Sequence, residues 1–193
     1  MRQTEQAKKI TRVAASLFAE KGYNGVGVAE IGAASGFGRG TLYHHIESKE
    51  DLLHEIASTY ISDLVHSGHR IVKEYPDPIQ RLKALSRHLM TVISSSLAEI
   101  VVCFREVQSL TGSRHDEVMC MHAEYQKIWS KTIDEGVEQN VFRAVDKVAV
   151  KGLLGMYFYS CLWLKPDGLQ SPADISDVFS DLVIRSLSKG PND

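Results

Sequence analysis

Apolar residues recur at spacings of three and four along almost the whole chain, and no stretch alternates strictly between apolar and polar positions. The first pattern is typical of a helix with one buried face, whereas strict alternation is typical of a half-buried strand. The sequence therefore predicts an all-α protein of about nine helices.

The predicted helices differ in length. The first spans residues 4 to 21, with Thr4 as its expected N-cap and Gly22 as its C-cap. A long helix starts at Ser48 and stops before the prolines at 76 and 78, because proline cannot continue a helix. Further helices are expected over residues 79–93, 100–110, 118–137, 147–164 and 172–187, the last opened by Ser171 and Pro172.

A glycine-rich turn separates two short predicted helices, over residues 28–35 and 39–45. Gly36 permits the positive φ that ends the first of them, and Phe37 is expected to be an apolar plug between the two. A phosphate-binding glycine loop would instead follow a strand. Because residues 28–35 have helical spacing, the pattern favours a helix-turn-helix over a nucleotide loop.

Two adjacent histidines, His44 and His45, follow in the second short helix. Neighbouring residues on a helix point in different directions and cannot easily share a metal, so no metal site is predicted. As a recognition helix it would turn Leu42 and Ile46 to the core. To a DNA major groove it would present Arg39, Gly40, Thr41 and His44.

The stretch VAEIGAASGFGRGTLYHHIESKEDLL, preceded by EKGYNGV, resembles the N-terminal domain of TetR-family transcriptional repressors over residues 8 to 53. The resemblance implies an all-helical homodimer. Residues 1–47 would bind an operator in double-stranded DNA, and residues 48–193 would bind a small effector and the partner subunit. It also implies that Tyr43 and Lys49 contact DNA phosphates.

Two glycines depart from the family pattern. Gly27 and Gly38 stand where the family usually has Thr or Ser as helix N-caps, and with Val28 they complete the expected DNA-facing set. A glycine cap costs only a few tenths of a kcal/mol, so both helices are expected to form. The missing hydroxyls predict fewer hydroxyl contacts to phosphate and more backbone N–H contacts. We therefore expect Gly27→Thr not to weaken operator binding.

The last two predicted helices are strongly apolar, over residues 147–164 and 172–187. Paired with the same helices of a second copy, they would form a four-helix bundle. A two-fold dimer of this kind sets its recognition helices about 34 Å, or a multiple of that, apart and requires a near-palindromic operator.

The middle helices carry polarisable and polar-tipped residues that could line an effector pocket. About half of them would instead be core residues, because Met and aromatic side chains at helical spacing usually pack in the core. The tail also resembles a TetR branch from actinobacterial lipid and steroid catabolism whose effectors are CoA thioesters, with a hydrophobic drug or fatty acid as the alternative ligand. Arg105, Lys127 or Lys151 would then meet phosphates. The predicted effector residues are Phe104, Met119, His122, Tyr125, Trp129, Met156, Tyr159 and Trp163.

Composition narrows these possibilities only slightly. The net charge is −2, and the longest apolar run, residues 152–164, is too short to span a membrane. The polar N-terminus is not a signal peptide, which predicts a cytoplasmic protein. Three separated cysteines in apolar patterns predict buried thiols and no disulfide.

Two other functions remain open from the sequence, a dimeric ligand sensor without DNA binding and a helical enzyme. The acidic and histidine side chains of the middle helices match no catalytic or metal-ligand spacing. The sequence therefore predicts no enzyme and no cofactor. The best available groups for catalysis are Glu99, Glu106, His115 and His122.

Overall fold

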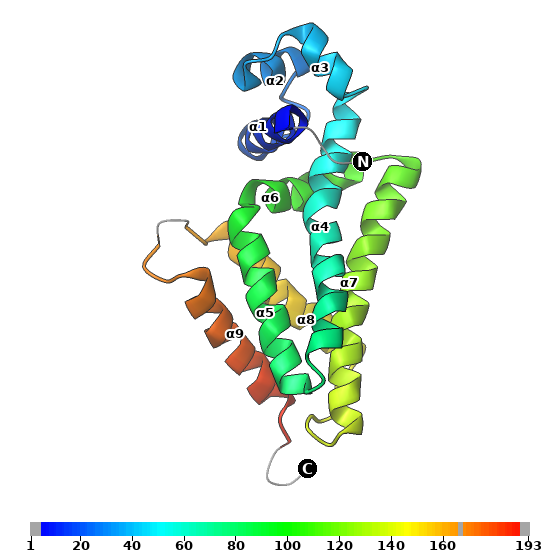
Figure 1. The fold of residues 1–193 in the computed structure, drawn as a ribbon, viewed down its shortest axis with the longest axis vertical. Helices are drawn as coiled ribbons and strands as arrows, with labels where there is room; N and C mark the ends of the chain where they lie inside the picture. Colours follow the sequence, from blue (N-terminus) through cyan, green and yellow to red (C-terminus); the bar gives the residue numbers. More distant parts are fainter. Residues whose placement is uncertain (1–4, 166–167, 190–193) are drawn as a thin grey trace. The chain divides into compact units, whose positions relative to one another are not determined.

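The computed structural model describes residues 5–165 and 168–189, without the side chain of Arg39. These residues form nine α-helices and two short 3-10 helices, η1 (Val107–Ser109) and η2 (Ser160–Leu162) (Figure 1). Their one strand-like feature is an isolated bridge between Phe142 and Ser188. The predicted all-α fold is confirmed, and the predicted N-cap Thr4 lies outside the described residues.

Most helix bounds agree with the spacing of apolar residues, with three differences. The helix predicted over residues 100–110 begins at Leu97, ends at Glu106 and passes into η1. The helix predicted from residue 118 begins earlier, at Gly112, and the one predicted to reach residue 164 ends at Tyr159 and passes into η2. None of the described helices is long and apolar enough to cross a membrane. The α-helices are α1 (Glu5–Lys21), α2 (Val28–Ser35), α3 (Arg39–His45), α4 (Lys49–Glu74), α5 (Pro78–Ser95), α6 (Leu97–Glu106), α7 (Gly112–Glu138), α8 (Lys147–Tyr159) and α9 (Pro172–Leu187).

Packing divides the described chain into two compact units. The first holds the residues up to Tyr60 together with 96–120, and the second holds 61–95 together with the residues from Met121 onward. Helices α4 and α7 therefore each contribute to both units. The expected boundary between residues 47 and 48 concerns function rather than packing, and it stays a prediction.

In the first unit, α1 buries one apolar face and packs against α2 and α6 (Figure 1). The end of α6 holds the end of α1 through two polar contacts. Arg105 donates from Nη1 to the carbonyl oxygen of Ala19 at 3.1 Å, and the backbone N–H of Tyr23 donates to Oε1 of Glu106 at 3.1 Å. The Ala19 carbonyl is one of the last carbonyls of α1, which have no partner within the helix, so Arg105 of α6 provides one. Glu106 binds an N–H of the turn that follows α1.

The start of α4 is joined to the start of α7 in the same unit. Ser48 and Asp51 form a reciprocal pair in which each side chain accepts from the other's backbone N–H, at 3.1 and 2.6 Å. Glu50 accepts from both the backbone N–H and the hydroxyl of Thr111, at 2.8 and 2.9 Å. Arg114 adds an ion pair with Asp51. The N-terminal turn of α4 is therefore fixed by its own cap and by the residues that open α7.

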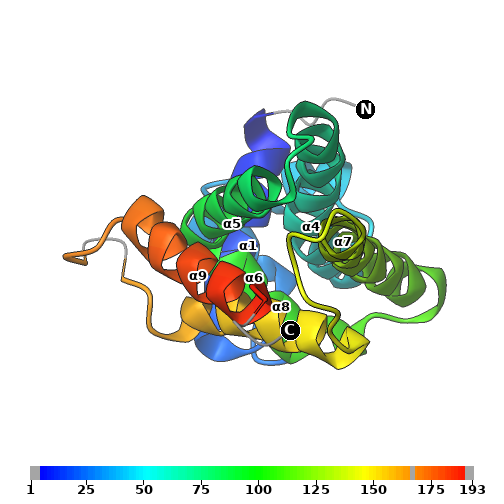
Figure 2. The same ribbon diagram turned by 90° about the horizontal axis from the view of Figure 1, so that it is seen from below.

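In the second unit, α5 packs along α9 (Figure 2). Two fully buried serines, Ser86 on α5 and Ser176 on α9, lie at this contact with their hydroxyl oxygens 3.1 Å apart. Small side chains at the crossing let the two helices approach closely. Both Ser171 and Pro172 open α9 as predicted, and Ser171 forms a capping box with Asp174.

Cys103, Cys120 and Cys161 all lie within the described residues and form no disulfide. Cys103 is buried as predicted, but Cys161 is only half-buried and Cys120 is exposed, so the prediction of burial was wrong for these two. Cys120 lies on the exposed face of α7. Helical periodicity over a short apolar run does not determine which face of the helix points to the core.

Candidate DNA interface and effector site

Gly27 and Gly38 are the N-caps of α2 and α3, as predicted. Both have extended backbone angles, φ −92° and ψ 153° for Gly27 and φ −66° and ψ 158° for Gly38, and neither has a side chain to bond to the helix. A Cβ at either position would meet nothing within 4 Å. The two helix starts are thus open, and a larger residue fits there without displacing a neighbour.

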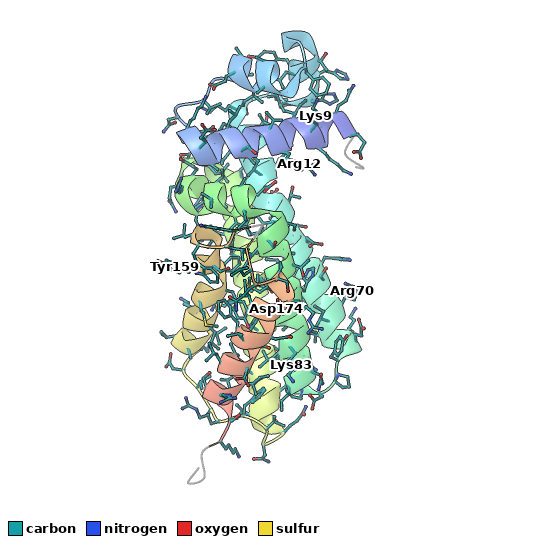
Figure 3. All side chains as sticks on the ribbon, turned by 90° about the vertical axis from the view of Figure 1, so that its left-hand side faces the viewer. Lys9, Arg12, Arg70, Lys83, Tyr159 and Asp174 are labelled. Carbon is teal, nitrogen blue, oxygen red and sulfur yellow. The ribbon has the colours of Figure 1, made fainter. Side chains whose placement is uncertain are left out.

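The turn between α2 and α3 depends on Gly36, whose φ of +76° lies in the left-handed region. The N–H of Phe37 donates back to the carbonyl oxygen of Gly32 at 3.1 Å, which closes α2. Phe37 is half-buried, and the ammonium of Lys9 lies 5.2 Å from its ring centroid. Lys9, on α1 (Figure 3), was not predicted to act here, because only the fold brings α1 to the turn.

Helix α3 has one inner and one outer side, as its predicted role requires. Leu42 is fully buried and Ile46 is 7% exposed. Thr41, Tyr43 and His44 are exposed, as are Gly40 and both cap glycines, while Val28 is half-buried. Arg39 begins the helix, but its side chain lies outside the described part of the structure. Thr41, Tyr43 and His44 therefore lie on the solvent side of α3, and their expected contacts with DNA stay predictions.

The two histidines of α3 do not form a metal site. Their rings meet edge to face at 5.5 Å, and Nε2 of His45 lies 3.2 Å from Oε1 of Gln6 on α1. No group of three metal-ligating side chains occurs among the described residues. This agrees with the interpretation of His44 as a surface residue of a recognition helix.

Lys49 begins α4, and its ammonium lies 4.2 Å from the ring centroid of Tyr23 and 5.9 Å from that of Phe18. Burial lowers the pKa of Lys49, and the nearby Glu106 carboxylate opposes this effect. No sequence pattern marks Tyr23 as its partner, since the two residues lie on separate elements. The predicted contact of Lys49 with phosphate is not tested by this arrangement and stays a prediction.

The eight predicted effector residues are divided between the two compact units. Phe104 and Met119 belong to the first compact unit and are exposed, whereas the other six belong to the second. Tyr125 and Trp129 are fully buried, and Tyr159 and Trp163 are 64% and 45% exposed. Tyr159 points outward from α8 (Figure 3). His122 and Met156 are half-buried.

Four of the second unit's aromatic contacts form a continuous chain from α7 through α8 to α9. Tyr125 and Trp129 meet at a ring-centroid distance of 6.4 Å, Trp129 and Tyr157 at 5.4 Å, and Tyr157 and Phe179 at 5.2 Å. Trp163 contacts Phe179 from the surface at 6.3 Å. Most of these pairs are edge to face, the geometry that aromatic quadrupoles favour. Tyr157 and Phe179 were not predicted, because their apolar spacing looks like that of any core residue.

Buried hydrogen bonds support the same region. The hydroxyl of Tyr157 donates to Oγ of Ser86 at 2.7 Å, and Ser86 donates to the carbonyl oxygen of Ser176 at 3.1 Å. Burial raises the pKa of Tyr157, so the phenol stays protonated and can donate. The three residues join α8, α5 and α9.

His122 lies on α7, one turn before Tyr125. Burial lowers its pKa to about 4, and its ring centroid lies 6.3 Å from that of Phe158. The imidazole is therefore neutral near pH 7 and adds no charge to the second unit.

Helices α8 and α9, with η2 between them, leave large apolar side chains exposed. Six of them are at least 45% exposed, more than scattered surface residues of a monomer usually provide. They are Val148, Tyr159, Leu162, Trp163, Val178 and Leu182.

Two family models match the chain. Residues 10–56 match the bacterial regulatory proteins of the tetR family, and residues 75–187 match the tetracyclin repressor-like C-terminal domain. The first match covers the three N-terminal helices and the start of α4, and the second runs from just before α5 to the end of α9.

Individual relatives match over nearly the whole chain. The HTH-type transcriptional repressor KstR2 of Rhodococcus jostii (strain RHA1) is 27% identical, over 93% of this chain and 90% of the relative. The solved structure of the TetR family transcriptional regulator PfmR from Thermus thermophilus has a TM-score of 0.85 at 29% identity, over 93% and 99% of the two chains. AibR, solved in complex with isovaleryl coenzyme A and operator DNA, has a TM-score of 0.78 at 27% identity, over 95% and 98%.

Proposed function

The chain belongs to the tetR family of bacterial regulatory proteins, and we propose that it is a repressor that a CoA thioester releases from a near-palindromic operator. The DNA-binding half of this proposal rests on the two sides of α3, one of which is buried while the other is exposed. Leu42 and Ile46 anchor the helix in the core while Thr41, Tyr43 and His44 stay exposed. That arrangement suits a helix lying in a major groove with its outer side chains on bases and backbone.

Phosphate contacts would fix the position of this helix on the duplex. Tyr43 and Lys49 supply a phenol and an ammonium for them, and the open helix start at Gly27 supplies backbone N–H groups. The close stacking of Lys49 on Tyr23 holds the ammonium in place before DNA binds. An ammonium that is already held against an aromatic ring loses little side-chain entropy when it meets a phosphate.

The exposed apolar face of α8 and α9 supports a two-fold dimer built on these helices. Trp163, Val178 and Leu182 would leave water when they meet the same residues of a second copy. Such a dimer presents two recognition helices, which is why the operator is expected to be near-palindromic. A repressor needs access to DNA, so the proposal includes a cytoplasmic location, and this role requires no catalytic group.

The aromatic residues of the second unit support an apolar effector. AibR, at 27% identity, was solved with isovaleryl coenzyme A, so a ligand of this class suits a close structural relative. We extend it to this chain, with the acyl group among the aromatic side chains of α7 and α8. Effector and operator then oppose each other by linkage.

Fluorescence anisotropy tests both halves of the proposal. A labelled duplex from upstream of the protein's own gene, or one selected from a random pool, is titrated with protein at several salt concentrations. We expect binding whose logarithm falls steeply and linearly with the logarithm of salt. Isovaleryl-CoA and longer acyl-CoA thioesters should release the duplex, whereas free CoA should not.

Tyr43→Ala is expected to weaken operator binding about tenfold, on the scale of one lost charged-group contact. Lys131→Ala, at an exposed position of α7 in the second unit, is the matched control and should bind as the wild type does. Failure of the wild type to bind any selected duplex would refute the repressor. Operator binding that no thioester reverses would remove only the proposed effector class.

A further inference from the structure

Two hydrogen-bond donors are buried in the second unit without an acceptor. Tyr125 is 1% exposed and Trp129 is fully buried, and they lie one turn apart on α7. Neither the phenol O–H of Tyr125 nor the indole N–H of Trp129 has a well-directed acceptor among the described residues. The indole lies close enough to the phenol oxygen to lower the pKa of Tyr125, but their contact lacks the geometry of a hydrogen bond. A buried polar group without a partner costs about 1–3 kcal/mol, so natural cores rarely keep two of them side by side.

Tyr157 shows that this core can satisfy a buried phenol. It is as fully buried as Tyr125, and its ring contacts the indole of Trp129 at 5.4 Å. Its hydroxyl nevertheless donates to Ser86 at 2.7 Å. The unsatisfied donors on this run of aromatic rings are therefore confined to Tyr125 and Trp129.

Both groups carry a hydrogen that can be donated to a ligand. The indole N–H has no acceptor capacity. Burial raises the pKa of Tyr125, and the nearby indole of Trp129 opposes this only in part, so the phenol stays protonated. A ligand atom that satisfies both must be an acceptor with two lone pairs, which describes a carbonyl oxygen.

The position of Tyr125 is fixed from the side of α4. A Cβ at Gly68 would lie 3.5 Å from Cε2 of the Tyr125 ring and 2.9 Å from Cδ1 of Ile128. The ring therefore lies beside α4 at Gly68, where the absence of a side chain leaves room for it. On the same side of α7, His122 is neutral near pH 7 and adds no charge next to the two donors.

We propose that the phenol of Tyr125 and the indole N–H of Trp129 together bind the acyl carbonyl oxygen of the effector. The inference rests on the proposed function, because it names the part of the thioester that this site recognises. It implies that the protein distinguishes a thioester from a hydrocarbon of the same length by its carbonyl.

The test compares an acyl-CoA thioester with the matching S-alkyl-CoA thioether, in which a CH₂ group replaces the carbonyl. Calorimetric titration of the wild-type dimer should give at least tenfold tighter binding of the thioester. Tyr125→Phe should reduce that ratio to about threefold or less, and its melting temperature without ligand should stay equal or rise, because an unsatisfied hydroxyl is removed. A free ketone and a free carboxylic acid of similar size complete the panel.

Tyr157→Phe is the matched control. It loses a satisfied hydroxyl, so its melting temperature should fall while its preference for the thioester stays as in the wild type. Equal wild-type binding of thioester and thioether, or an unchanged preference in Tyr125→Phe, would overturn the inference and leave the repressor proposal standing. Binding of the free ketone alone, lost in Tyr125→Phe, would support the two donors while rejecting CoA thioesters as the effector class. If no carbonyl compound binds, both the two-donor site and the CoA-thioester effector class are rejected.

Discussion

The neutral state of His122 makes the stability of the protein depend on pH in a defined window. Burial lowers the pKa of His122 in the folded protein from 6.5 to about 4. Between these values the unfolded chain binds a proton that the folded chain does not, so acid favours unfolding. The stability present above about pH 6.5 is therefore lost progressively as the pH falls toward 4.

The size of the effect follows from the two pKa values. They differ by about 2.5, and since one pKa unit equals about 1.4 kcal/mol, the full loss for this group is about 3 kcal/mol at pH 4. At pH 5 the expected loss is about 2 kcal/mol. This is a large share of the 5–15 kcal/mol that typically stabilises a domain.

Urea unfolding followed by circular dichroism, at pH 7.5, 6 and 5 with ionic strength and protein concentration held constant, measures this loss. We expect His122→Gln to lose about 2 kcal/mol less than the wild type between pH 7.5 and 5. The pKa of His88 is also lowered, mainly by burial, so some slope will remain in the variant. His66→Gln, at an exposed position of α4, is the control and should keep the wild-type slope. A wild-type slope in His122→Gln would refute the reasoning.

Three further changes test the packing. Gly36→Ala should lower the free energy of unfolding by about 1–2 kcal/mol, because φ is +76° there, and should weaken operator binding in the anisotropy assay. Gly136→Ala should cost about 1–3 kcal/mol in the same urea assay, since its Cβ would overlap the buried Phe142 ring. Arg81→Met should cost about 3 kcal/mol, because it removes the buried guanidinium that pairs with Glu135 and leaves that carboxylate only its ion pair with the exposed Lys131. Arg87→Met, which breaks an exposed ion pair, should cost less than about 1 kcal/mol. Equal losses in the two arginine variants would contradict this account.

The features that sequence predicted well are those set by neighbouring residues. The spacing of Leu42 and Ile46 predicted the buried side of α3, and it left Thr41 and Tyr43 on the outer side. Glycine caps and the turn at Gly36 were also predicted, because a helix end depends on the few residues around it.

The features that sequence could not predict depend on residues far apart in the chain. Glu106 binds the backbone N–H of Tyr23 across 83 positions, and Tyr157 binds Ser86 across 71. No local pattern marks one serine among many as the partner of a buried phenol. Local spacing also does not fix exposure: the side chain of Phe104 is 57% exposed, and its expected contact with the effector stays a prediction.

The two proposed donors lie at one end of a chain of direct contacts that reaches α9. An acyl carbonyl held by Trp129 would reposition an indole that packs on Tyr157, and Tyr157 contacts Phe179 of α9 at 5.2 Å. Because packed cores are not continuously deformable, a shift at one ring is passed to the next as a discrete repacking. The adjoining face of α9 exposes Val178 and Leu182, the surface proposed to meet the second copy. Effector binding would therefore act directly on the dimer contact. Linkage then requires that operator binding lowers the affinity for the effector by the same factor by which the effector lowers the affinity for the operator.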